Sequence, residues 1–72
     1  MSIALASERI TISLVPKAAA DLALLQERTA LSKTDLVNRA ISLYEFTDAQ
    51  MAAGRDLLVR DPDGTVQLVK LL

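Results

Sequence analysis

Polar and apolar residues alternate strictly over residues 9–14 of this 72-residue chain. The polar members are Arg9, Thr11 and Ser13, and the apolar members are Ile10, Ile12 and Leu14. This period of two is typical of a strand with one buried face. A lone strand leaves its backbone groups unpaired, and no second strand pattern follows for about forty residues, so we expect the same strand of a second copy as its partner. A two-stranded ribbon with a polar outer face fits a DNA major groove.

A second group of polar residues surrounds the expected start of a long helix. Ser32 is a favourable N-cap, and Asp35 lies three residues later, as in a capping box. The amides of Lys33 and Thr34, the Ser32 hydroxyl and the helix dipole together form an anion site. Lys17, at the start of an earlier helix, is a further candidate, although lysines such as Lys17 and Lys33 are more often plain surface residues.

The residue types that most enzymes use are absent from the sequence. The chain has no His, no Cys and two Gly, which excludes disulfides, the usual zinc sites and a glycine-rich phosphate loop. Asp61 and Asp63 suggest a calcium loop, but the alternating ligands and closing Glu of such a loop are missing, and a turn explains them better. We therefore predict no enzymatic activity, no metal and no cofactor.

Length and composition indicate a core shared between subunits. Seventy-two residues form one small domain, in which burial exceeds conformational entropy by little. Half of the residues are apolar, yet Tyr44 and Phe46 are the only aromatic ones. Many apolar residues in a small chain without disulfides favour a homodimer.

The net charge of −1 is the main argument against nucleic acid, because DNA-binding domains are usually basic. The part before Thr47 is neutral, however, and the acidic excess follows it, so DNA affinity would come from a few placed contacts. The N-terminus lacks the pattern of a signal peptide, and no apolar stretch is long enough to cross a membrane. We expect a cytoplasmic protein without membrane contact.

Five segments follow from these patterns. We predict a flexible arm over 1–7, a strand over 8–14, helices over 16–29 and 32–53 with Gly54 as the C-cap of the second, and a β-hairpin over 55–72 around an Asp-Pro-Asp-Gly turn. The second helix carries an apolar stripe wide enough for two neighbours, its own partner helix and a symmetry mate. The predicted dimer core is Ile10, Ile12, Leu14, Leu36, Val37, Ala40, Ile41, Leu43 and Tyr44.

The strand at Arg9–Leu14, Pro16 with a short helix, and LSKTDLV at 31–37 opening a longer helix resemble the ribbon-helix-helix proteins, the MetJ/Arc/CopG-type bacterial and phage repressors. The resemblance covers about residues 8–52. It implies a mainly α fold, in which β-α-α chains form an intertwined homodimer, here with a C-terminal β-hairpin extension. By position, it implies DNA base contacts from Arg9, Thr11 and Ser13 and phosphate contacts from Ser32, Lys33 and Thr34; we add Lys17 as a further phosphate contact.

The chain departs from that family at two places. The family often has Gly in the turn between the helices, where this chain has Thr29 and Ala30, so a left-handed turn would cost roughly 1 kcal/mol more than with Gly. The hairpin lies outside the family core, and its side chains are too apolar to remain in solvent, so it packs on the dimer or contacts another dimer or protein.

The resemblance implies a sequence-specific transcriptional regulator, a repressor, that binds double-stranded DNA as a homodimer. Higher-order association on DNA, a role as an antitoxin, and a protein partner at the hairpin remain open. One alternative is a dimeric protein-interaction module with little DNA binding, which the charge favours. Another is a monomer in which the hairpin supplies the partner for the first strand.

Overall fold

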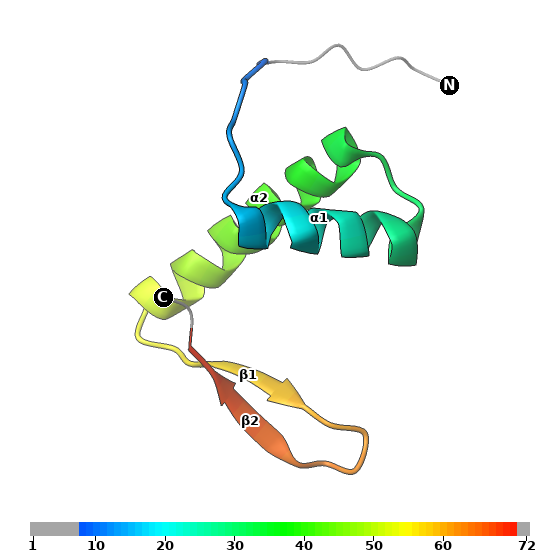
Figure 1. Ribbon diagram of the computed structural model, residues 1–72. Coiled ribbons are helices and arrows are strands. Elements are labelled where there is room, and N and C mark those ends of the chain that lie inside the picture. The colour runs from blue at the N-terminus through cyan, green and yellow to red at the C-terminus, as the bar shows by residue number, and fades with distance from the viewer. Residues whose placement is uncertain (1–7, 71–72) are drawn as a thin grey trace, which may run out of the picture.

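The computed structural model describes residues 8–70 and contains two helices and one two-stranded sheet (Figure 1). Helix α1 spans Pro16–Thr29 and helix α2 spans Lys33–Ala52. Strands β1 (Leu57–Arg60) and β2 (Val66–Val69) form an antiparallel hairpin. The predicted flexible arm over 1–7 lies outside the described residues. The fold is thus a pair of packed helices with an extended segment before them and a hairpin after them.

Helix α1 begins at a proline and ends in a left-handed residue. Val15 is its extended N-cap, and Pro16 occupies the first turn, where its missing N–H has no partner to lose. Ala30 ends the helix with φ 59° and ψ 19°, and its N–H donates to the Gln26 carbonyl at 2.8 Å. This is the left-handed turn that the sequence makes costly, because a Cβ crowds the backbone in that conformation.

The side chain of Thr29 helps to hold this turn. Its hydroxyl donates to the Leu25 carbonyl at 2.6 Å and accepts from the Leu31 N–H at 3.2 Å. The same oxygen therefore joins the last turn of α1 to the residue after the left-handed Ala30. Local hydrogen bonds of this kind offset part of the strain that Gly would have avoided.

Helix α2 has a recognisable capping feature at each end. At its start, the Ser32 hydroxyl accepts from the Asp35 N–H at 3.1 Å, as predicted for an N-cap. At its end, the prediction of Gly54 as C-cap is one residue late, because Ala53 is the C-cap and Gly54 follows with φ 85°. Gly54 occupies the next position because a Schellman motif needs a positive φ there.

The Schellman motif joins α2 to the hairpin. The Gly54 N–H donates to the Met51 carbonyl and the Arg55 N–H to the Gln50 carbonyl, each at 3.0 Å. The Arg55 guanidinium also donates to the Gln50 side chain at 3.1 Å. These bonds set the direction in which the chain leaves the helix.

The hairpin is closed by the predicted Asp-Pro-Asp-Gly turn. The Gly64 N–H donates to the Asp61 carbonyl at 2.9 Å, and Gly64 has φ 95°. The Asp63 carboxylate accepts from the Thr65 N–H at 2.9 Å. This bond, with a smaller contribution from the Thr65 side chain, lowers the pKa of the Asp63 carboxyl.

The strand predicted over 8–14 is absent from the single chain. Residues 8–15, called the leading segment below, precede α1 without regular secondary structure. Figure 1 shows this segment projecting from the start of α1, away from the hairpin. Within residues 8–70 the sheet contains β1 and β2 alone, so the hairpin does not supply a partner for the leading segment. A strand exists only when its backbone groups are paired, and the expected pair is a second copy.

The single chain buries few side chains. Leu36 and Thr47, both on α2, are 7% and 5% exposed, and they are the two buried residues in the described part. The chain exposes 6809 Å², whereas a compact monomer of this mass would expose roughly 4,400 Å². Within residues 8–70 no helix combines the length and apolarity needed to cross a membrane.

Candidate nucleic-acid interface

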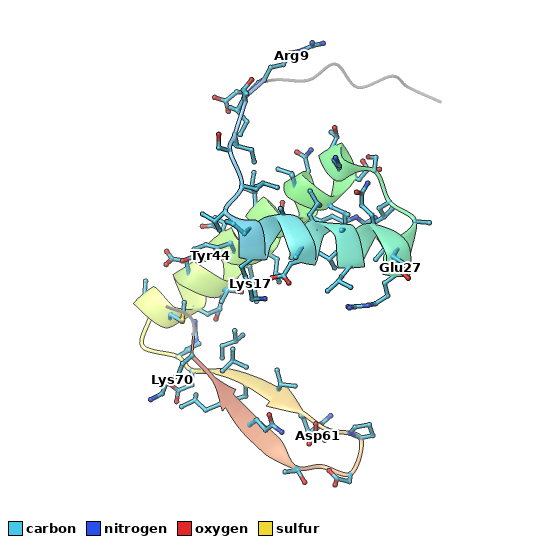
Figure 2. The ribbon with its side chains drawn as sticks, in the orientation of Figure 1. Arg9, Lys17, Glu27, Tyr44, Asp61 and Lys70 are labelled. Carbon is cyan, nitrogen blue, oxygen red and sulfur yellow. The ribbon has the colours of Figure 1, made fainter. Side chains whose placement is uncertain are left out.

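The leading segment presents both of its faces to solvent. Its alternating apolar residues Ile10, Ile12 and Leu14 are 61%, 51% and 41% exposed, Val15 after them is 66% exposed, and the polar residues Arg9, Thr11 and Ser13 are exposed as well. Figure 2 shows Arg9 near the outer end of the segment, with its side chain directed away from the helices. The base-reading candidates are therefore accessible, while the apolar residues between them lack the cover that a strand face needs.

The second candidate site, at the start of α2, has part of its phosphate-binding arrangement in place in the single chain. Ser32 forms its N-cap bond, and Lys33 and Thr34 are exposed in the first turn. The positive end of the helix dipole therefore coincides with one lysine and two hydroxyl groups. The Asp35 carboxylate lies in the same turn and offsets part of this positive charge.

Lys17 is engaged by a neighbour on its own helix. Its Nζ lies 2.8 Å and 3.0 Å from the two carboxylate oxygens of Asp21, one turn later. Both side chains are exposed, so this ion pair is weak, but a phosphate would have to compete with it. In Figure 2, Lys17 lies on the opposite side of α1 from Arg9. Of the four predicted phosphate contacts, Lys17 is therefore the least supported by the geometry.

The predicted dimer core divides into two groups. Leu36 is buried within the single chain and Val37 is half-buried, so Leu36 belongs to the core of the single chain. The other members are exposed: Ile10, Ile12, Leu14, Ala40, Ile41, Leu43 and Tyr44. Phe46, which the prediction left out, is also exposed. The wide apolar stripe of α2 is thus buried at Leu36, half-buried at Val37 and exposed at its other apolar residues.

Two structural features were missed at the sequence level, although each has a visible signal. Thr47 lies eleven residues after Leu36, about three helical turns, which places both on the same line of α2. Lys17 and Asp21 have the i,i+4 spacing that brings opposite charges together on a helix. Both patterns could have been found from helical periodicity alone.

Comparison with known proteins adds no assignment. The chain matches no protein-family model, no curated protein and no solved structure.

Proposed function

We propose that this protein is a homodimeric, sequence-specific DNA-binding transcriptional regulator, a repressor of the ribbon-helix-helix type. In this proposal the leading segments of two copies pair antiparallel as a two-stranded ribbon. The ribbon enters the major groove of double-stranded DNA, and the helices of the two copies share one core. Neither a metal nor a cofactor takes part.

One observation carries this proposal. An alternating segment with three exposed apolar residues runs directly into two helices whose own apolar flanks are also exposed. Pairing two leading segments would satisfy their backbone groups and turn Ile10, Ile12 and Leu14 to one side. That side would then cover exposed apolar residues of α2, among them Ile41, Leu43 and Tyr44.

The polar face of the ribbon would contact the DNA bases. Arg9 can donate two hydrogen bonds to a guanine, while Thr11 and Ser13 can bond to several bases, and Thr11 can contact a thymine methyl. A two-fold dimer presents each residue twice, which predicts a pseudo-palindromic site. Ser32, Lys33 and Thr34 would hold a phosphate beside the ribbon, since helix amides and a lysine suit an anion.

The charge balance predicts the character of the binding. With a net charge of −1, the protein gains little from non-specific attraction to phosphates. Selectivity would therefore depend on the base contacts, and weakly on charge elsewhere. We expect modest total affinity with a high ratio of specific to non-specific binding.

Fluorescence anisotropy with DNA from immediately upstream of the coding region, at two salt concentrations, tests this function. Arg9→Ala should remove selective binding, and Thr11→Ala should weaken binding to the selected site by about 1–3 kcal/mol with little change in stability. Arg28→Ala is the matched control, because it removes the same charge from an exposed site at the end of α1. Equal losses in all three variants, or equal losses on all DNA sequences, would contradict base reading.

The acidic C-terminal part favours one rival function. After Thr47 the acids Asp48, Asp56, Asp61 and Asp63 outnumber the bases Arg55, Arg60 and Lys70. This excess suits a dimeric protein-interaction module, such as an antitoxin, that binds little DNA. The same titration separates the two functions, because the rival predicts no selective DNA binding and no effect of Arg9→Ala.

A further inference from the structure

The hairpin has two faces that the strand register defines. Leu58 pairs with Leu68 and Arg60 with Val66, so these side chains share one face. Continuing the register by one residue places Asp56 opposite Lys70 on that face. We call this set the outer face: Asp56, Leu58, Arg60, Val66, Leu68 and Lys70.

The other face lies toward α2. Leu57 and Val69 are paired there and are half-buried. A shallow hollow at the junction with α2 is lined by Met51 and Arg55 together with these two residues, and Asp56, Leu68 and Lys70 of the outer face also border it. The apolar residues of the outer face are more exposed than Leu57 and Val69, since Leu58, Val66 and Leu68 are 55%, 52% and 53% exposed, while Val59 of the other face, nearer the turn, is 51% exposed. Within residues 8–70, Leu58 and Val66 of the outer face are therefore open to solvent, and Leu68 borders the hollow beside α2.

The charges of the outer face are arranged in a self-complementary order. Asp56 lies just before β1 at the base of the hairpin, Leu58 lies within β1, and Arg60 ends β1 near the turn. A two-fold axis across the strands through the Leu58–Leu68 pair would reverse this order in a second copy. Asp56 of each copy would then lie opposite Arg60 of the other, and Leu58 would lie opposite itself. An acid would face a base at both ends of an apolar contact.

A different axis is disfavoured by the helices. An axis along the strands would bring the bases of both hairpins to the same end. Each hairpin base is joined by a Schellman motif to its own α2, so two helix ends would crowd together there. The axis across the strands places the two α2 ends at opposite ends of the contact.

We propose that the outer face of the hairpin is a self-association surface whose occupant is the outer face of a second copy, antiparallel to it. The contact is small, with three apolar residues from each copy, so it is weak and depends on concentration. Figure 1 shows the hairpin and the leading segment on opposite sides of the helices. Pairing of hairpins therefore leaves the leading segment free, and this proposal is independent of DNA binding.

Single cysteines in the full chain test the contact, because the natural sequence has none. Leu58→Cys should form disulfide-linked pairs under mild oxidation at least about ten times faster than Gln67→Cys, since Leu58 lies on the proposed axis. Gln67 is the matched control, being an exposed residue on the other face of the same hairpin. Equal rates for the two variants would overturn the proposal.

A mixing experiment tests the direction of the pairing. Asp56→Cys and Arg60→Cys, oxidised together, should yield more mixed disulfide than either yields alone. More self-linked than mixed product would overturn the antiparallel arrangement. A Leu58→Cys chain that reacts fully with a thiol reagent but never cross-links would mean that the face is free for a different protein, which also overturns it.

Sedimentation of a charged variant measures association through the hairpin without introducing a disulfide. Leu68→Asp should raise the concentration at which chains associate through the hairpin by at least about tenfold, with an unchanged helical circular dichroism spectrum. Gln67→Asp adds the same charge on the other face and should leave that concentration unchanged. An identical association curve for Leu68→Asp and the natural chain would contradict a hairpin contact.

Discussion

The leading segment and the hairpin are both extended, apolar and short, yet only the hairpin forms strands. In the hairpin, β1 and β2 are joined by a turn that includes Pro62 and Gly64, so the partner strand lies a few residues away. The leading segment has the stricter alternation but meets no partner within residues 8–70 of its own chain. Strand propensity therefore sets which residues can pair, and the distance to a partner decides whether they do so in a single chain.

Of the substitutions that probe the difference between the leading segment and the hairpin, Ile12→Asp should have the largest effect. Two copies of this variant would place two charges in the buried face of the ribbon, which costs several kcal/mol. We expect loss of the dimer and of most helical structure at micromolar concentration, measured by sedimentation and circular dichroism. Ser13→Asp, on the polar face of the same segment, should remain dimeric. A folded, dimeric Ile12→Asp protein would refute the face assignment.

Gly64→Ala should weaken the hairpin alone. Gly64 has φ 95°, and a Cβ there would meet nothing within 4 Å, so the cost is backbone strain without a clash. We expect a local destabilisation of about 1–2 kcal/mol. Amide hydrogen exchange should speed up over Leu57–Val69 and stay constant in α1 and α2. Faster exchange throughout the chain would show that the hairpin and the helices unfold together.

Ala30→Gly should stabilise the helical part that separates the two regions. Ala30 is left-handed, and Gly removes the Cβ strain, for an expected gain of about 1 kcal/mol in the free energy of unfolding. Ala53→Gly is the matched control, since Ala53 ends α2 with φ −82° and should gain nothing. Denaturant titration measures both, and a less stable Ala30→Gly variant would contradict the role given to this turn.

The smallest effect concerns pH. The lowered pKa of Asp63 means that its ionised form stabilises the folded turn. This contribution is fully present above the ordinary carboxyl pKa and is lost as the pH falls through the lowered value. NMR shifts of Thr65 should report a local loss of the turn in acid, and Asp63→Asn should remove that transition. A Thr65 transition that persists in the variant would assign it to another group.

The helices could be predicted closely because their ends are marked in the sequence. Pro16 begins α1, Ser32 caps α2, and Gly54 lies one position beyond the C-cap of α2. The hairpin could be predicted for the same reason, since its turn residues favour that geometry. Each of these features depends on contacts within a few residues.

Burial and the ribbon could not be predicted in the same way. Leu36 and Ile41 both belong to the apolar stripe of α2, but Leu36 is buried within the single chain and Ile41 remains exposed. The periodicity identifies the stripe without dividing it between an internal and an external neighbour. The DNA-contact residues likewise stay predictions, because their geometry depends on molecules outside the single chain.

The small buried core of the single chain has a consequence for how the protein responds to its own rate of synthesis. On the proposed dimer, most of the apolar contact forms only when two chains meet, so the folded population follows the square of the free chain concentration. A newly made chain at low abundance stays open to proteases until it finds a second copy. On this proposal the amount of dimer rises steeply above a threshold of expression, and a modest change in gene dosage becomes a large change in the amount of folded dimer.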